Sequence, residues 1–303
     1  MAEPPVETSH RCGLAALVGR PNVGKSTLLN RLVGEKVSIV TRKPHTTRHR
    51  ILGIHNRPDA QVVYVDTPGL HQGAKSMMNR SLNRAAEGAL EDVDTVVLVV
   101  DAQHWTEQDE AVLERLAEVP VPVLLALNKV DRIPHKEQLL PLLESLSGRR
   151  EFAALVPLSA TRGINVDALE AEVVSRLPES PALFETDRAT DRSERFRVAE
   201  LFREQLMAAL GEELPYATAV GVERYEREGR LLRLSLVVWV ERDGQKAIVI
   251  GAGGRRLKAL ASAARREMEA VLRARVHMEV WVKVRSGWSD DERALRSLGY
   301  GEE

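Results

Sequence analysis

The chain has 303 residues, and at roughly 150 residues per domain this length predicts two domains. Hydrophobic residues make up 44% of the chain, which is enough to pack a core in each domain and excludes disorder over the full length. The 43 Lys and Arg against 44 Asp and Glu leave a formal charge of -1, so the whole chain lacks a polyanion-binding signature. The positive charge lies late, because residues 192–285 hold 19 basic against 13 acidic side chains.

Cysteine usage and hydropathy indicate the compartment. Cys12 is the only cysteine, so an internal disulfide is excluded and a reducing cytoplasm is expected. The longest apolar runs, such as Val96–Val100 and Val121–Leu127, are far shorter than the ~20 residues needed to cross a bilayer. The first ten residues lack the basic and apolar regions of a signal peptide. We therefore predict a cytoplasmic protein without a transmembrane segment.

Short apolar runs alternate with helical patterns over the first 177 residues. The predicted strands are Leu14–Val18, Ile51–Asn56, Val62–Val65, Thr95–Val100, Val123–Leu127 and Phe152–Leu158. The predicted helices are Lys25–Val33, Met77–Leu90, Glu107–Ala117, Lys136–Leu146 and Val166–Arg176. Pro58 and Asp59 mark a hairpin that adds one antiparallel strand, while the alternation predicts a mostly parallel sheet covered on both faces. The predicted class is a doubly wound α/β domain.

A second domain begins after a linker. Pro178, Pro181 and the polar stretch DRATDRS interrupt the alternation. The elements predicted after it are a helix Glu194–Leu210, strands Ala217–Tyr225 and Leu231–Glu241, a short helix, a basic helix to Leu272 and a strand His277–Val284. This α-β-β-α-α-β order predicts an α+β domain. The expected division is 1–178, a linker at 179–193, and 194–303 with a C-terminal helix.

A phosphate-binding motif directly follows the first strand. The sequence GRPNVGKST matches G-x-x-x-x-G-K-[ST] and opens a helix, where glycines let backbone N–H groups surround phosphates. Lys25 is expected to contact the β- and γ-phosphates, and the Ser26 hydroxyl to bind Mg²⁺. The expected phosphate-binding residues are Gly19, Arg20, Pro21, Asn22, Val23, Gly24, Lys25, Ser26 and Thr27. Alone, this motif predicts an NTPase of unspecified base.

Three further motifs follow strands in the order of a GTP site. Asp66-Thr67-Pro68-Gly69 places a carboxylate for Mg²⁺ and a Gly69 N–H for the γ-phosphate. In Asn128-Lys129-Val130-Asp131, the Asp131 carboxylate can accept from two ring N–H groups of guanine but repels adenine. Asn128 is expected to shape that loop and the Lys129 stem to cover the ring. Leu158-Ser159-Ala160 offers the Ala160 N–H to the guanine carbonyl.

Together these motifs resemble the Era family of bacterial GTPases. The stretches that carry the resemblance are GRPNVGKSTLLN, TRKPHTTRHR, DTPGLH, NKVD and LSA, then TDRSERF, ELPY, VIGAGG and KVRSGWSDDERALRSLGY. They span residues 11–301, and the later group is similar to the family's KH domain. The resemblance implies a Ras-like P-loop GTPase domain followed by a type II KH domain, hydrolysis of GTP to GDP with Mg²⁺, and binding to the 3′ end of 16S rRNA during assembly of the 30S ribosomal subunit.

The resemblance also assigns roles in the hydrolytic step. Thr47, in the basic stretch 42–50, is expected to complete the Mg²⁺ shell and to act with Lys25 and Gly69, with Thr46 as the alternative. A solvated basic loop is the other interpretation of that stretch. Leu70 takes the position where Ras-type enzymes carry the glutamine that orients water, which predicts slow intrinsic turnover. An arginine finger is not evident; Arg48 and Arg50 are the only candidates.

A glycine-rich loop in the second domain predicts RNA binding. Gly251-Ala252-Gly253-Gly254 lies between two helices, and such a G-x-x-G loop in a KH fold clamps about four nucleotides. Residues 244–285 hold 10 basic against 3 acidic side chains, which attracts phosphate whatever the sequence. The residues expected to contact RNA are Gly251, Ala252, Gly253, Gly254, Arg255, Arg256 and Lys258. Taken alone, a glycine helix cap and a solvated basic helix would explain the same features.

Two rival functions follow from the same residues. One is an RNA-binding chaperone in which nucleotide is a structural or regulatory ligand and turnover is incidental. The other, a P-loop kinase, conflicts with Asp131. The chain is expected to act as a monomer, and peripheral association with the inner membrane is an alternative that only its basic surface supports.

Overall fold

The computed structural model describes residues 10–44, 46–68, 88, 90, 92–211 and 213–291. They form two compact units, which are described separately. In the described part, the first unit holds residues 10–38, 50–68 and the chain from 88 to 191, and the second holds 39–49 and the chain from 192 onward. The predicted C-terminal helix and all but residues 88 and 90 of the predicted helix Met77–Leu90 lie outside the described residues.

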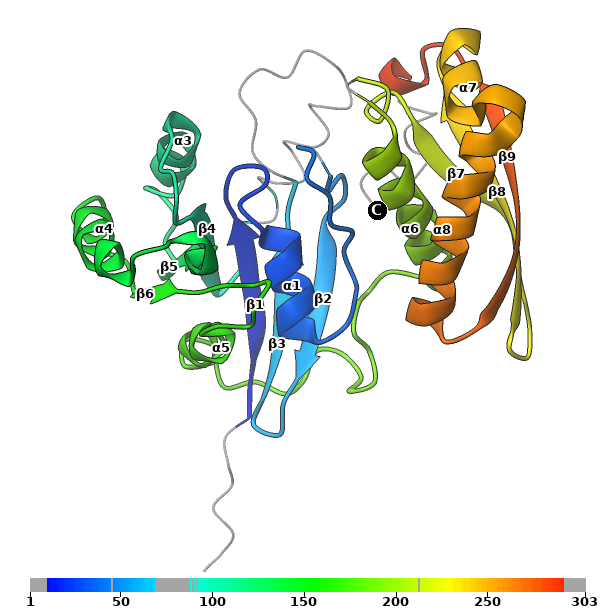
Figure 1. Cartoon of the computed structure of the whole chain (residues 1–303). Helices are drawn as coiled ribbons and strands as arrows, with labels where there is room; N and C mark the ends of the chain where they lie inside the picture. The colour runs from blue at the N-terminus through cyan, green and yellow to red at the C-terminus, as the bar shows by residue number, and fades with distance from the viewer. Residues whose placement is uncertain are drawn as a thin grey trace, which may run out of the picture. The chain divides into compact units, whose positions relative to one another are not determined.

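The first unit is built on a six-stranded sheet (Figure 1). Its strands are β1 (Arg11–Val18), β2 (Ile51–Asn56), β3 (Ala60–Asp66), β4 (Thr95–Asp101), β5 (Val123–Asn128) and β6 (Ala154–Pro157). The spatial order is β2-β3-β1-β4-β5-β6, in which β2 pairs antiparallel with β3 and the remaining pairs are parallel. The prediction of a mostly parallel sheet with one antiparallel strand is confirmed.

Helices cover both faces of this sheet. They are α1 (Lys25–Val33), α3 (Glu107–Arg115), α4 (Leu139–Ser147) and α5 (Val166–Val174), with 3-10 turns η1 (Val130–Arg132) and η2 (Lys136–Gln138). Val112, Leu113 and Leu146 from α3 and α4 pack on alternate residues of the central strands, while α1 and α5 contact each other and β1. The helix predicted from Lys136 begins as a 3-10 turn, and the α-helix starts at Leu139. Its first turn holds Pro141, which needs no N–H partner there.

The second unit has the predicted α-β-β-α-α-β order. Its elements are α6 (Glu194–Ala209), β7 (Ala219–Glu228), β8 (Leu231–Val240), α7 (Asp243–Ile250), η3 (Ala252–Gly254), α8 (Arg255–Leu272), β9 (Arg275–Val284) and η4 (Trp288–Asp290). The sheet order is β7-β8-β9, with β7 antiparallel and β9 parallel to β8. Phe202 of α6 and Met268 of α8 are fully buried in one core with alternate residues of β8, so both helices cover one face of the sheet.

The polar linker packs on the first unit. The backbone N–H of Ile54 in β2 donates to the Ala189 carbonyl at 2.8 Å. The buried side chain of Gln61 accepts from the N–H groups of Leu183 and Phe184 at 2.8 and 2.9 Å. The division between the two units therefore falls after residue 191, later than the start of the polar stretch.

Candidate functional site

The loop between β1 and α1 is organised around Lys25. This side chain is only 7% exposed, and its Nζ donates to the carbonyls of Gly19 at 2.8 Å and Arg20 at 3.1 Å. The first helical hydrogen bond runs from Leu28 N–H to the Gly24 carbonyl, so the N–H groups of residues 24–27 are not used within the helix. With the helix dipole behind them, these donors form an anion-binding turn.

Two glycines of the loop are required by both conformation and space. Gly19 and Gly24 have φ of 147° and 105°, which L side chains rarely adopt. A Cβ at Gly19 would lie 2.3 Å from the Val99 carbonyl oxygen, and one at Gly24 would lie 2.4 Å from the Asn128 amide nitrogen. The second close approach shows that the phosphate loop and the NKVD loop are packed directly on each other.

Asn128 joins three loops of the site. Its Nδ2 donates to the Val23 carbonyl at 2.8 Å, and its Oδ1 accepts from the N–H groups of Lys129 at 2.8 Å and Ala160 at 3.0 Å. The side chain is 2% exposed. The expected loop-shaping role of Asn128 therefore has a definite geometry. The Ala160 N–H, which we expected to face the guanine carbonyl, points instead to Asn128.

The residues expected to recognise guanine follow the end of β5. Lys129 has φ of 68°, and its Nζ donates to the Asn22 carbonyl at 2.6 Å and to Asp101 Oδ2 at 2.7 Å. Burial is the largest single influence on Asp101 and would raise its pKa, but the hydrogen bonds from Lys129 and the Gln103 N–H, together with the charges of Lys129 and Arg20, outweigh it and the pKa is lowered. Asp131 in η1 is exposed, and its carboxylate makes no hydrogen bond or ion pair within the described ranges. That carboxylate is thus open to a base.

Oxygen ligands suited to Mg²⁺ meet at the end of β3. Ser26 Oγ donates to Asp66 Oδ2 at 2.7 Å, and Ser38 Oγ donates to the same oxygen at 3.0 Å. Asp66 is fully buried. Hydroxyl and carboxylate oxygens are the ligands that Mg²⁺ prefers, so Ser26 and Asp66 fit the ion. No cluster of three or more His, Cys, Asp or Glu suited to a metal occurs among the described residues.

Burial changes the pKa of Lys25, the lysine of the phosphate loop. It lowers the pKa of Lys25 to about 8, although the Asp66 carboxylate opposes this shift. A lysine that is costly to charge in the folded protein gains most from an anion placed beside it. The site is therefore prepared electrostatically for a polyphosphate.

The expected switch segment is part of the second unit. Val40 N–H donates to Glu204 at 2.8 Å, and Arg203 Nη2 donates to the Thr46 carbonyl at 2.6 Å while also pairing with Glu200. Thr47 is 8% exposed and belongs to this unit, not to the unit of Ser26 and Asp66. Its role as an Mg²⁺ ligand stays a prediction, and Gly69 and Leu70 lie outside the described residues.

Arg48, one of the two candidates for an arginine finger, is bonded within the second unit. Its guanidinium donates to the carbonyls of Thr218 at 2.9 Å, Pro215 at 3.0 Å and Tyr216 at 3.3 Å, and the residue is 3% exposed. These bonds lie within the second unit and use the fork that would have to reach a phosphate. Arg48 instead anchors the segment from residue 39 to 49.

The G-x-x-G loop has the backbone that its glycines predict. Gly251, Gly253 and Gly254 have φ of 71°, 58° and 75°, and Gly254 N–H donates to the Gly251 carbonyl at 3.0 Å. The loop opens α8, whose first turn carries no acidic residue. Two of the expected phosphate ligands partly brace the loop, because Arg256 donates to the Ile248 carbonyl at 2.7 Å and Arg255 to the Ala252 carbonyl at 3.2 Å.

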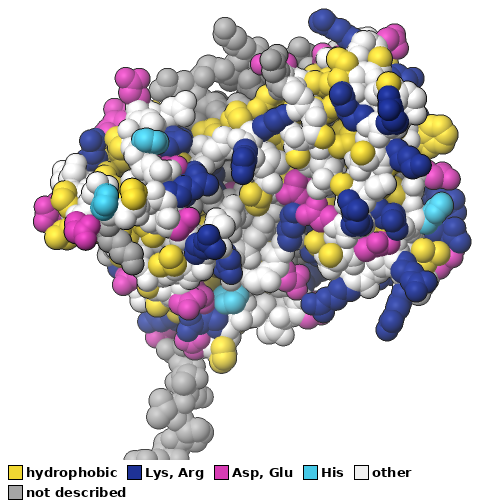
Figure 2. Space-filling model, in the orientation of Figure 1, with side chains coloured by type: hydrophobic (Ala, Val, Ile, Leu, Met, Phe, Trp, Pro, Cys, Tyr) yellow, Lys and Arg dark blue, Asp and Glu magenta, His cyan; other side chains and the backbone are white. Residues whose placement is uncertain are grey.

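Basic side chains cover part of the surface of the second unit. In Figure 2, dark blue Lys and Arg side chains extend over the face that carries α7 and α8 in Figure 1.

No helix in the described ranges is long and apolar enough to span a membrane.

Sequence inspection missed several residues of the nucleotide site. Ser38 reaches Asp66, and the Asn30 side chain positions it by accepting from the N–H groups of Val37 and Ser38, both at 2.9 Å. Arg20 pairs with the fully buried Asp109 of α3 at 2.9 Å. Ser38 and Asp109 lie outside the recognised motifs, and although Asn30 ends the stretch GRPNVGKSTLLN, its spacing does not reveal which backbone groups it contacts.

Comparison with known proteins agrees with this geometry. The family model described as 50S ribosome-binding GTPase matches residues 14–129, and the KH domain model matches residues 213–289. GTPase Era of Stenotrophomonas maltophilia is 54% identical over 294 residues, covering 97% of this chain and 99% of that protein. GTPase Era of Pseudomonas aeruginosa is 53% identical over 297 residues, covering 98% and 97%.

Solved structures give the same result. A crystal structure of Era in complex with MgGDPNP and nucleotides 1506–1542 of 16S ribosomal RNA matches with a TM-score of 0.93 and 36% identity, over 97% of this chain and 100% of that one. A variant of Aquifex aeolicus Era bound to GDP·AlF4⁻ matches with a TM-score of 0.93 and 36% identity, over 96% and 100%. Since relatives more than half identical are covered almost end to end, this chain belongs to the Era family of GTPases.

Proposed function

We propose that this GTPase binds GTP with Mg²⁺ at the first unit and the 3′ end of 16S rRNA at the G-x-x-G loop, and that it serves assembly of the 30S subunit. One observation carries the proposal: a single chain combines a phosphate loop and an NKVD loop, joined by Asn128, with a glycine loop that opens a basic helix. A relative with the same fold has been solved in complex with MgGDPNP and nucleotides 1506–1542 of 16S ribosomal RNA.

The residues of the first unit divide the work of phosphoryl transfer. Lys25 and the N–H groups that open α1 hold the phosphates, and Ser26 and Asp66 hold Mg²⁺, which supplies charge neutralisation when bound. Asp131 selects guanine through two acceptor oxygens. We infer that Thr47 and the Gly69 N–H position the γ-phosphate side, while Leu70 cannot hydrogen-bond the attacking water. Slow intrinsic turnover follows.

The proposed partners are 16S rRNA and the 30S subunit that contains it. Because the 3′ end of 16S rRNA belongs to the small subunit, we infer that one copy of this chain engages the 30S subunit in the cytoplasm. The RNA backbone can approach Gly253 and Gly254 closely, since a Cβ at either position would meet no atom within 4 Å. Open space at these glycines is what a clamp on phosphate and sugar requires.

A charge placed at Gly254 tests the RNA clamp. Gly254→Asp should weaken RNA binding by about tenfold or more, because a carboxylate would face the approaching phosphate. Gly254→Asn is the matched control: Asn and Asp both tolerate the φ of 75°, have nearly the same shape and differ in charge. The measurements are affinity for a 16S rRNA 3′-end oligonucleotide and phosphate release with and without it.

RNA binding and phosphate release together distinguish the RNA clamp from the rival function. We expect Gly254→Asp to keep basal GTP hydrolysis and lose any stimulation by RNA, with Gly254→Asn close to the parent. If Gly254→Asp bound RNA with the affinity and salt dependence of the parent, the loop would not be the clamp. Basal hydrolysis that RNA never changes in the parent protein would favour the rival function, an RNA chaperone with incidental turnover.

A further inference from the structure

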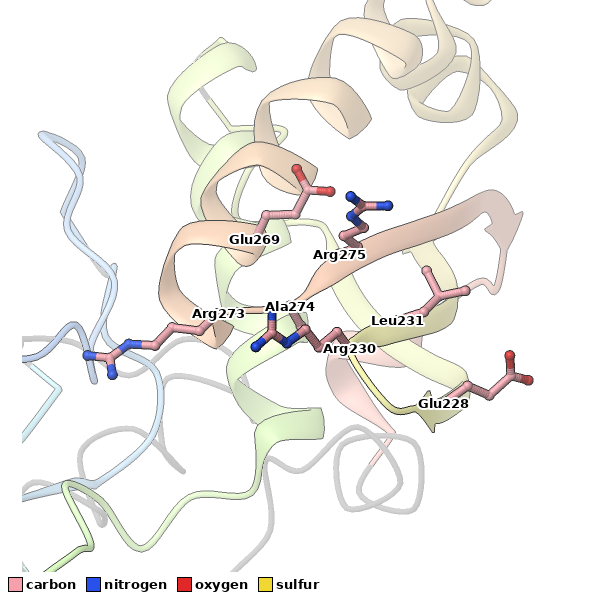
Figure 3. A pocket seen from close by; sticks show the side chains of 7 residues that line it. All are labelled: Glu228, Arg230, Leu231, Glu269, Arg273, Ala274 and Arg275. Carbon is pink, nitrogen blue, oxygen red and sulfur yellow. The ribbon is translucent and has the colours of Figure 1, made fainter.

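We propose a second RNA phosphate site at the end of α8 opposite the G-x-x-G loop, formed by Arg230, Arg273 and Arg275. The proposal rests on the RNA binding proposed above and adds a site to it. A surface pocket of about 600 Å³ lies at this end of the unit (Figure 3). Its lining residues are Glu228, Arg230, Leu231, Glu269, Arg273, Ala274 and Arg275.

Three separate segments bring the arginines to one pocket. Arg230 lies in the turn between β7 and β8, Arg273 ends α8, and Arg275 begins β9. The backbone N–H of Arg275 donates to the Arg230 carbonyl at 2.7 Å, which fixes the turn beside the start of β9. In Figure 3, the side chains of Arg230 and Arg273 extend in the same direction, and Arg275 rises on the side of Glu269.

The carboxylates of the pocket do not neutralise these arginines. Glu228 pairs with Arg233 at 3.2 Å, and Glu269 pairs with Arg265 at 3.3 Å. Glu269 also accepts from the N–H of Val276 at 3.1 Å. None of the guanidinium groups of the three pocket arginines makes an ion pair or hydrogen bond within the ranges that the structure describes. When each glutamate is counted with its arginine partner, the two ion pairs are neutral and the three pocket arginines leave a local excess of three positive charges.

The backbone conformation of Arg273 also supports the proposal. It ends α8 with φ of 50° and ψ of 40°, a left-handed conformation for which glycine is the usual choice. An arginine there carries a conformational cost that an ordinary helix end avoids. A cation does favour the negative end of the helix dipole, but that dipole amounts to about half a charge, far less than the three charges present.

A basic stripe connects this pocket to the G-x-x-G loop. Lys258, Arg266 and Arg273 are exposed and follow one face of α8 at helical spacing, because seven or eight residues complete two turns. The 18 residues of α8 span about 27 Å, so the two ends can hold different parts of one RNA strand. The stripe makes a continuous nucleic acid a better match than a small isolated anion.

The chemistry of the site matches RNA phosphates. Guanidinium groups bind phosphate oxygens in pairs through their planar fork, which is why arginine dominates phosphate recognition. Five of the seven residues that line the pocket are charged, and Leu231 and Ala274 are the two apolar ones. A surface that inserts into a bilayer presents large apolar side chains to it. The ligand we assign is therefore the backbone of RNA beyond the nucleotides held by the loop.

Oligonucleotide length separates the two sites. Full-length protein would be titrated with 16S rRNA 3′-end strands of about four nucleotides, which the loop alone can hold, and of about three times that length. The test variant is Arg230→Gln/Arg273→Gln/Arg275→Gln. The control variant, Arg115→Gln/Arg188→Gln/Arg224→Gln, removes the same charge from exposed arginines that do not line the pocket.

The expected result is selective. The test variant should bind the longer strand about tenfold more weakly at moderate salt, with the slope of log affinity against log salt smaller by about 2, since each single-strand phosphate contact contributes about 0.7. The short strand should bind as it does to the parent protein, and the control variant should match the parent with both strands. Circular dichroism at the working temperature establishes that the test variant is folded.

Four outcomes would contradict the proposal or the RNA function on which it rests. Equal binding of the two strands by the parent protein would remove the second site and leave the loop clamp intact, whereas binding of neither strand would reject the proposed RNA function itself. If the control variant also bound the longer strand more weakly, the loss of affinity would be due to net charge and not to the pocket. If the test variant kept its RNA affinity but no longer bound vesicles of phosphatidylglycerol and phosphatidylethanolamine, the ligand would be a membrane.

Discussion

The side-chain amide of Asn128 donates to the Val23 carbonyl at 2.8 Å and so joins the guanine-recognition loop to the phosphate loop. The same side chain accepts the Ala160 N–H, and Gly24 leaves no room for a Cβ beside it. The loop predicted to bind the base and the loop predicted to bind phosphate are therefore coupled through one side chain, and we expect a change at Asn128 to disturb both.

Asn128→Asp tests this link. The variant replaces a donor by a carboxylate oxygen against the Val23 carbonyl at a site that is 2% exposed, which should cost about 2 kcal/mol or more in the free energy of unfolding and weaken GDP and GTP alike. Thermal denaturation and nucleotide titration measure the two effects. Gln103→Glu makes the same chemical change at an exposed neighbour and should be neutral. Loss of affinity without loss of stability would show that Asn128 only contacts the base.

Asp131→Asn tests base selection. The exchange of an acceptor for a donor opposite the ring should weaken GTP and favour xanthine nucleotides, with little effect on the fold because Asp131 is exposed. Competition between GTP and XTP for one labelled guanine nucleotide measures the preference. Asp187→Asn, at another exposed aspartate, is the control. An unchanged preference for guanine would remove Asp131 from the site.

Lys25 should make nucleotide affinity depend on pH. Its pKa of about 8 in the protein without nucleotide rises when phosphates bind, so affinity is full below pH 8 and falls as the pH rises above it, by up to about tenfold per pH unit. GDP titrations between pH 7 and 9 measure the effect. Lys25→Arg stays charged throughout and shares any titration of the nucleotide itself, so its profile should be flatter. If GDP affinity fell equally with pH in the parent protein and in Lys25→Arg, the titration of Lys25 would not be the cause.

His49 should make the second unit sensitive to acid. Burial lowers the pKa of His49 to about 4; Glu200 opposes this shift, and Arg203, Arg192 and Arg48 add to it. The ring also packs edge-on against Phe196, with centroids 5.0 Å apart. Since the unfolded chain has a histidine pKa of about 6.5, the stability that depends on neutral His49 is complete above that pH and is lost as the pH falls toward 4.

The size of this effect can be measured by urea unfolding. At pH 5 the loss relative to pH 7 should be about 2 kcal/mol. Tryptophan fluorescence suits the measurement, because Trp239, Trp281 and Trp288 all lie in the second unit and Trp288 is fully buried. His49→Gln should lower stability at pH 7 and reduce the difference between pH 7 and pH 5. The same difference in both proteins would show that other groups cause the acid sensitivity.

Much of the first unit could be predicted from the sequence because its determinants are local. Helix α1 and strand β2 have the predicted bounds, Lys25–Val33 and Ile51–Asn56, since the glycines of the phosphate loop and the turn at Pro58 fix where the chain changes direction. The helix predicted from Lys136 began later because no local pattern distinguished a 3-10 turn from the first turn of an α-helix.

The sequence by itself determined which motifs are present: a phosphate loop, a DTPG motif, an NKVD motif and a glycine loop before a basic helix, each encoded within a few consecutive residues. Only the tertiary structure decided how distant residues meet. Asn128 lies 105 residues from Val23, Ser38 reaches Asp66 across 28 positions, and Arg48 binds carbonyls 167 to 170 residues away. Likewise, a turn, a helix end and a strand start converge on one arginine pocket. The physical reason is that side-chain hydrogen bonds and pocket charges depend on distance in space, whereas a sequence pattern records only spacing along the chain.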